Sequence, residues 1–157
     1  MLVEMDVKFL TFDSTSNSLV VLLMDLSNKT GLPIWIGPFE ANAIATKLKK
    51  IGSHLPMTHD LIYIILGTLE SQVLKIVVND LKENIYYALI HLNRRGEEFI
   101  IDSRSRDTIA IALVVDAPIF VSDQVIKKAR TIDMKKEGNV LKEWLENFNP
   151  DDFKYKA

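Results

Sequence analysis

Hydrophobic residues come in short runs along this chain, separated by polar residues and glycines that favour turns. Residues 3–12 begin the pattern, followed by 19–26 and 32–36, and each run has the length of a β-strand. The segments between them, 13–17 and 27–31, are rich in Asp, Ser, Asn and Gly, which are common in turns. We therefore expect the chain to open with three strands of one sheet.

Two helices are expected after these strands. Gly37 and Pro38 begin the first, because proline is favoured at the first helical position, and apolar residues at helical spacing continue it as far as Gly52. Thr58 is the expected N-cap of the second helix, which would run to about Glu70. Its apolar run could also form a strand, but the cap and the length of the segment favour a helix.

The same order of elements is expected a second time, because the sequence is similar to itself at an offset of 67 positions. Eight residues are identical when 8–45 is aligned with 75–112, and the expected turns coincide. The predicted fold class is α+β: an internally duplicated unit of three strands and two helices, with pseudo-two-fold symmetry and helices packed on a mixed or antiparallel sheet. One domain would cover residues 1–135, with copies at about 3–70 and 71–135.

A polar segment, residues 102–107, stands where a strand of the second copy leads into a helix. Asp116 and Pro118 are expected to end that helix. At the same offset Asp107 falls on Glu40, so each copy has an acidic residue in the first turn of a helix. Such a junction is a natural place for an anion to bind or for a reaction to occur.

The symmetry fades after Ser122, which is expected to cap a short helix ending at Arg130. Residues 136–157 form a tail with apolar side chains at helical spacing. We expect this tail to be an amphipathic helix packed on its own domain, the alternative being a partner subunit.

Composition narrows the range of functions. The chain has no cysteine, which excludes disulfides and cysteine-based zinc or redox sites. It shows neither a secretory signal nor an apolar run long enough to cross a bilayer, so we expect a cytoplasmic protein without a membrane partner. The net charge of −2 gives no global basic surface for nucleic acid. DNA or RNA would have to contact local basic clusters, which are Lys47/Lys49/Lys50, Arg94/Arg95, Arg104/Arg106 and Lys127/Lys128/Arg130.

The polar segment holds the first candidates for chemistry. Asp102 and Asp107 flank Arg104 and Arg106; carboxylates suit Mg²⁺ or Mn²⁺, and an arginine pair suits a phosphate. The alternative is structural, with Asp107 stabilising its helix dipole and an ion pair between Asp102 and Arg104. No organic cofactor is indicated, since glycine-rich phosphate loops are absent.

Further candidates lie at the other helix starts. Glu40 could act as Asp107 does, or merely stabilise its helix. His59 beside Asp60 could provide a general base or a metal ligand, or could simply face solvent at the start of a helix. Trp35 is expected in the core rather than as a stacking platform for bases, and sequence spacing cannot show whether His59 and Asp102 meet.

Five segments of the chain resemble the bifunctional nuclease family: residues 32–45, 55–62, 85–92, 101–113 and 117–123. The resemblance covers nearly the whole chain, and the end of the chain is similar to that of stand-alone bacterial members. It implies a compact α+β domain, oligomers in some members, and activity against DNA and RNA. The family's polar motif positions fall on Glu40, Thr58, His59, Asp60, Asp102, Arg104 and Asp107. Two positions depart from the family pattern, Leu55 before Pro56 and Ser105-Arg106 before Asp107.

Two functional hypotheses follow, and the sequence leaves open whether the chain is an enzyme. The first is a metal-dependent nuclease that hydrolyses phosphodiester bonds of DNA and RNA, and a homo-oligomer is expected under either hypothesis. Its catalytic residues would be His59, Asp60, Asp102 and Asp107, its phosphate-binding residues Arg104 and Arg106, and its Mg²⁺ or Mn²⁺ ligands Glu40, Asp102 and Asp107. The second is a non-catalytic ligand-binding or assembly module with an anion site at residues 102–107.

Overall fold

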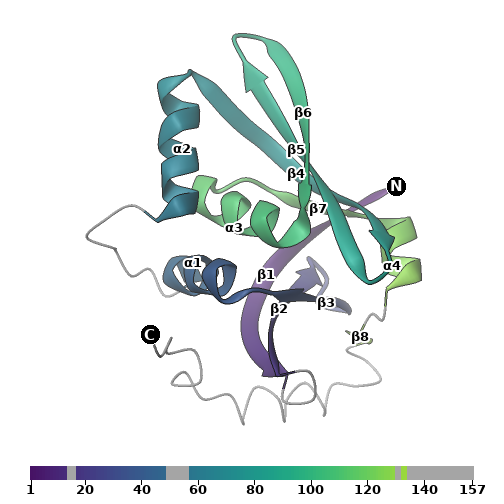
Figure 1. Ribbon diagram of the computed structural model, residues 1–157. Helices are drawn as coiled ribbons and strands as arrows, with labels where there is room; N and C mark the ends of the chain where they lie inside the picture. The colour runs from purple at the N-terminus through teal and green to yellow at the C-terminus, as the bar shows by residue number, and fades with distance from the viewer. Residues whose placement is uncertain (14–16, 49–56, 130–131, 134–157) are drawn as a thin grey trace.

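Two antiparallel meanders joined by one short strand form a single mixed sheet in the computed structural model, which describes residues 1–13, 17–48, 57–129 and 132–133 (Figure 1). The strand order is β6-β5-β4-β7-β1-β2-β3-β8. β7 is antiparallel to β1 and parallel to β4, so it joins the two halves. The strands are β1 (Leu2–Asp13), β2 (Ser18–Asp25), β3 (Thr30–Ile36), β4 (Ser71–Lys82), β5 (Ile85–Arg94), β6 (Glu97–Arg104), β7 (Ile119–Ser122) and β8 (Ile132–Asp133).

Three helices pack together beside this sheet, and four of the six buried residues of the central one are apolar. They are α1 (Pro38–Leu48), α2 (Thr58–Thr68) and α3 (Ser105–Val115); α3 lies between the other two and contacts both (Figure 1). Ile109 on α3 and Ile44 on α1 are completely buried in the core that helices and sheet share. A fourth helix, α4 (Asp123–Lys128), lies apart against β4 and β7.

The expected fold class, α+β, is confirmed. Pro38 occupies the first helical position of α1, as predicted. The predicted end of α3 is also confirmed: Asp116 adopts a left-handed conformation, with φ of 58°, and the N–H of Ala117 donates to the carbonyl of Ala112. Ser122 caps α4 by accepting a hydrogen bond from the Val125 N–H (3.3 Å).

Other expectations need correction. Thr58 is not the N-cap of α2; Met57 is, and the carboxylate of Asp60 accepts its N–H at 3.0 Å, which satisfies a helix-end donor. β7 was not expected, so the second half of the chain reads strand, strand, strand, helix, strand, helix. The internal duplication therefore stays a prediction, although both halves form one continuous sheet. Gly52, Arg130 and the tail 136–157 lie outside the described residues, as does the predicted packing of that tail.

The sheet bends so that the two meanders approach each other at one end. The hydroxyl of Tyr86 on β5 donates to the carbonyl of Pro33 on β3 at 3.4 Å, although four strands separate β5 from β3 in the sheet. Tyr86 is buried at this contact, and its burial raises the pKa of the phenol. This closure brings the β4–β5 turn next to β3, where it shapes one of the pockets described below.

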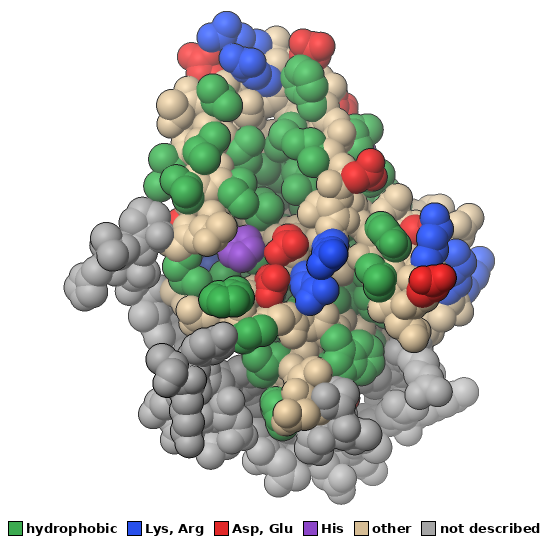
Figure 2. Space-filling view, in the orientation of Figure 1, with side chains coloured by type: hydrophobic (Ala, Val, Ile, Leu, Met, Phe, Trp, Pro, Cys, Tyr) green, Lys and Arg blue, Asp and Glu red, His purple; other side chains and the backbone are tan. Residues whose placement is uncertain are grey.

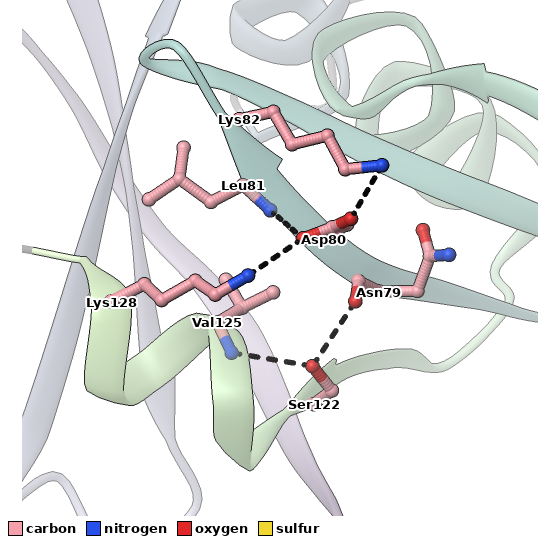
Figure 3. Close-up of polar contacts among 7 residues, drawn as sticks. All are labelled: Asn79, Asp80, Leu81, Lys82, Ser122, Val125 and Lys128. Carbon is pink, nitrogen blue, oxygen red and sulfur yellow. Dashed lines mark hydrogen bonds and ion pairs between the residues drawn. The ribbon is translucent and has the colours of Figure 1, made fainter.

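An ion-pair network fastens α4 to β4 (Figure 3). The carboxylate of Asp80 lies 3.0 Å from the Nζ of Lys82 and 3.1 Å from the Nζ of Lys128, and it also accepts the Leu81 N–H. Hydrogen bonds from these two lysines, with that of the Leu81 N–H, lower the pKa of Asp80 from 3.8 to about 2. Asp80 is therefore ionised at every pH at which the protein would ordinarily be handled.

This network predicts a pH-dependent difference between the wild type and Asp80→Asn. A folded-state pKa below the unfolded one gives stability that is present above the unfolded pKa, near 3.8, and is lost as the pH falls towards 2. Thermal unfolding of both proteins should show the wild type as the more stable one at pH 7, with the difference shrinking from about pH 4 and lost as the pH falls through about 2. A difference that is the same at pH 7 and pH 2 would contradict the assigned ion pairs.

Candidate active site

The first turns of α1, α2 and α3 line one pocket, which we call the helix-start pocket. The pocket has a volume of about 500 Å³ and brings together Glu40 from α1, His59 from α2 and Asp107 from α3. Phe39, Met57, Thr58 and Ile62 complete its lining. Residues far apart in the sequence meet here because α3 packs between the other two helices.

Within this pocket a histidine faces a carboxylate. The Nε2 of His59 lies 3.9 Å from the Oδ1 of Asp107, an ion-pair distance when the imidazole is protonated. The His59 side chain is only 9% exposed, whereas that of Asp107 is 44% exposed, so the imidazole is held in place and the carboxylate reaches solvent. Pairs of this kind are often loose in the free protein and tighten when substrate binds.

The local sequence explains why these groups lie at helix starts. Glu40 and Asp107 each stand in a first turn, where a carboxylate is stabilised by the positive end of the helix dipole. The Glu40 carboxylate lies against Gly37, since a Cβ there would come within 2.5 Å of its Oε2. Asp60 also stands in a first turn, but its carboxylate is occupied by the Met57 N–H and it is not among the residues that line the pocket.

A second pocket, the arginine pocket, also borders the start of α3. It has a volume of about 250 Å³, and its lining includes Arg104, Ser105 and Arg106 together with Trp35 and Tyr86. Asp107 follows Arg106 directly, so adjacent residues of α3 face the two pockets. Figure 2 shows a histidine, acidic side chains and basic side chains side by side in the middle of this face.

Residues of two other predicted basic clusters make contacts within the protein. Arg95 forms an ion pair with Glu70, and the Nε of Arg94 donates to the carbonyl of Leu69. Lys127 pairs with Asp123, and Lys128 with Asp80, as described above. Lys49, Lys50 and Arg130 lie outside the described residues. Arg104 and Arg106 are therefore the predicted basic pair that opens into a pocket beside the candidate catalytic groups.

Asp102 lies on β6, where its backbone pairs with Leu89, and it lines neither of the two pockets. The predicted ligand set of Glu40, Asp102 and Asp107 is thus brought together only in part. Carboxylate oxygens and imidazole nitrogens are suitable donors for Mg²⁺ or Mn²⁺. Over the described ranges, however, no three His, Asp or Glu side chains lie close enough together to hold a metal ion. The side chains as they stand do not form a ready-made metal site.

The aromatic residues of this face were missed by the sequence analysis. Trp35 was expected in the core and is in fact 45% exposed, and Phe39 is 73% exposed. The sequence carried a signal for this, because Trp35 stands between Ile34 and Ile36 in a strand. These two isoleucines are buried, and strand alternation then places Trp35 on the opposite face. The apolar run around it hid this alternation.

Comparison with known protein families finds a match that includes the helix-start pocket. The model of the bifunctional nuclease domain matches residues 20–134, which include every helix and residue of the helix-start pocket. The chain belongs to the bifunctional nuclease domain family. The family resemblance predicted from the sequence is therefore confirmed.

Relatives of this bifunctional nuclease domain protein give no further functional information. Two uncharacterised proteins from two strains of Mycobacterium tuberculosis are each 32% identical to it, over 96% of this chain and 98% of their own length. In the part of the chain that the structure describes, no helix is long and apolar enough to span a membrane.

Proposed function

We propose that this protein is a nuclease that hydrolyses phosphodiester bonds of DNA and RNA in the helix-start pocket. The observation that carries the proposal is the pairing of His59 with Asp107 next to Arg104 and Arg106 at the start of α3, in a member of a nuclease-type family. A proton acceptor and a phosphate-binding pair are the minimum that such a hydrolysis needs from a protein.

His59 is the proposed general base. In its neutral form it would accept a proton from the attacking water molecule. The water oxygen forms a bond to phosphorus, the bond from phosphorus to the leaving oxygen breaks, and that oxygen takes up a proton from the protonated imidazole or from solvent. Asp107 would orient the imidazole and stabilise its protonated form, because the carboxylate stands 3.9 Å away.

Arg104 and Arg106 are the proposed phosphate-binding residues. Guanidinium groups match the geometry of phosphate oxygens and remain charged, so they can offset the negative charge of the substrate and of the transition state. The positive ends of the dipoles of α1, α2 and α3 also meet at the helix-start pocket and favour an anion there. These cations and dipoles are needed, because Glu40 and Asp107 would otherwise repel a phosphate.

The metal requirement stays a prediction from the sequence. Glu40 and Asp107 are the ligands that line the pocket, and Asp102 would have to come from β6. When bound, Mg²⁺ or Mn²⁺ would neutralise charge on the phosphate. We assign no step to it, since the described side chains do not converge into a three-donor group.

The second hypothesis, a non-catalytic module that binds an anion, is favoured by one observation. The arginine pocket lies beside the helix-start pocket rather than within it, so an anion could bind there without reaching His59. Hydrolysis measured directly separates the two hypotheses.

The test is hydrolysis of labelled single-stranded DNA and RNA by the wild type, by Asp107→Asn and by Asp102→Asn, each with Mg²⁺, Mn²⁺ or a chelator. Asp107→Asn removes the negative charge that stands 3.9 Å from the imidazole and would stabilise its protonated form. A loss of about 1.4–2.7 kcal/mol of that stabilisation makes the reaction about tenfold to a hundredfold slower. Asp102→Asn tests the third predicted ligand. Its side chain lines neither pocket, so we expect little effect, and a loss of metal-dependent activity would instead assign Asp102 to the metal.

Three results would contradict parts of this proposal. No hydrolysis by purified wild type would favour the anion-binding module. Equal activity in all three proteins, prepared identically, would place the activity outside the helix-start pocket. Full activity in the presence of the chelator would contradict the predicted metal requirement while leaving the roles of His59 and Asp107 standing.

A further inference from the structure

We propose that the surface beside the candidate active site binds a single-stranded segment of nucleic acid, with one unpaired base stacked on Trp35. This inference rests on the proposed function, and it adds the substrate form and a binding residue that the hydrolysis itself does not require. It follows from the shape, the aromatic residues and the charges of two neighbouring pockets.

The arginine pocket continues into a larger pocket of about 600 Å³. Trp35, Asn84 and Tyr86 line both, so the two form one continuous groove, which we call the Trp35 groove. The groove exists because the sheet bends and brings the β4–β5 turn next to β3. Its size is that of pockets that hold small ligands or single nucleotide units.

Trp35 is the residue suited to stacking. Its side chain is part of the wall of both pockets and is nearly half exposed. The indole Nε1–H donates to the carboxylate of Asp13 at 3.3 Å, which fixes the plane of the ring. A ring held in one orientation loses little conformational freedom when a base stacks on it. Tyr86, by contrast, is buried and forms a rigid side of the groove.

The charges along the groove suit a phosphate backbone. Arg104 and Arg106 line one end, and Lys128 lines the other. Lys128 shares the carboxylate of Asp80 with Lys82, so that cluster keeps a net positive charge. Aromatic stacking combined with a basic groove is the usual way in which proteins bind single strands without reading their sequence.

The groove also leads to the candidate catalytic groups. Arg106 lines it and Asp107, the next residue of α3, lines the helix-start pocket. A strand that crosses the start of α3 would therefore place one base on Trp35 and a neighbouring phosphate near His59. A base inside a duplex has both faces covered by its neighbours, so only an unpaired base can stack on Trp35.

Trp35 itself provides the readout, because the chain has only two tryptophans. The full-length variant Trp144→Phe removes the second one and leaves Trp35 as the only tryptophan. Adding His59→Asn to it suppresses cleavage during a titration. We expect a short oligothymidylate to quench the fluorescence in a saturable manner, and the duplex of the same sequence to quench it far less.

The fluorescence anisotropy of a labelled oligothymidylate measures its affinity and shows how much the Trp35 ring contributes to binding. Loss of one stacked base corresponds to about a fivefold to a hundredfold loss of affinity, so we expect Trp35→Ala to weaken binding to this extent. Phe99→Ala is the matched control. The exposed fraction of Phe99, 43%, is close to the 45% of Trp35, but Phe99 lies on β6 and lines no part of the groove. Its affinity should equal that of the wild type.

The outcomes separate this inference from the proposed function. Equal binding by Trp35→Ala and Phe99→Ala, equal binding of duplex, or no binding of oligothymidylate at all would overturn the groove as a single-strand site, whether or not the wild type hydrolyses nucleic acid. Quenching of Trp35 by single strands, with no hydrolysis by the wild type, would support the groove and reject the nuclease.

Discussion

His59→Asn is expected to lower the rate of phosphodiester hydrolysis by about a hundredfold to ten-thousandfold, the usual contribution of a general base. Asparagine keeps a polar side chain of similar reach but cannot accept the proton at neutral pH. The imidazole is the group in the helix-start pocket placed to do so, 3.9 Å from the carboxylate that would stabilise its charge. Initial rates on labelled single-stranded RNA and DNA measure the effect.

His91→Asn is the matched control for this substitution. His91 lies on β5 and its Nδ1 is 2.9 Å from the Oε1 of Glu98 on β6, so it also pairs with a carboxylate, but it lines neither pocket. We expect His91→Asn to hydrolyse at the rate of the wild type. Comparable rates for His59→Asn and His91→Asn would reject His59 as the base.

Because His59 is buried, its substitution could act through the structure alone. Chemical rescue distinguishes proton transfer by His59 from such a structural role. His59→Ala should regain part of its activity when imidazole is added, because the pocket, of about 500 Å³, has room for the free base. Thermal unfolding of each variant shows whether it still folds. A folded His59→Ala that imidazole does not rescue would favour a positioning role over proton transfer.

Ile109→Ala is expected to destabilise the protein by about 2–5 kcal/mol. Ile109 is completely buried on α3, the helix that contacts both α1 and α2, so its loss removes apolar contacts and leaves a cavity where three helices meet. Denaturant unfolding gives the change as a shift of the midpoint.

The control for this prediction is Ile64→Ala, the same substitution on helix α2 at a position that is 47% exposed. An exposed change of this kind is worth about 0.5 kcal/mol or less. If both substitutions cost the same, α3 is not the centre of the helical layer. In that case folded Ile109→Ala should also keep its hydrolytic activity, because the position of Asp107 would not depend on the packing of Ile109.

The strands and helices followed from local physical chemistry, and most were predicted. Pro38 sets the start of α1 because its ring fixes φ, and Ser122 starts α4 because its hydroxyl accepts a free N–H. The predicted strands of the first meander differ from β1, β2 and β3 by two residues or fewer at each end. These features depend on neighbours in the sequence, which the sequence displays directly.

The features that the sequence analysis missed have different physical causes. β7 has four residues, too few for a period to appear, and it becomes a strand because β1 and β4 flank it in the sheet. Met57 is the N-cap in place of Thr58 because the carboxylate of Asp60, inside the helix, accepts the Met57 N–H. Trp35 is exposed because it alternates along β3 with the buried Ile34 and Ile36, an alternation that the surrounding apolar run hid.

The amino-acid sequence by itself determined the family, the α+β fold class and the kinds of groups available, since carboxylates, arginines and a histidine at helix starts can be recognised one position at a time. Only the tertiary structure decided which of them meet. It brings Glu40, His59 and Asp107 into one pocket and leaves Asp60 and Asp102 outside it. The reason is that the packing of α1 and α2 against α3 sets distances between residues far apart in the chain, and spacing along a sequence carries no information about those distances.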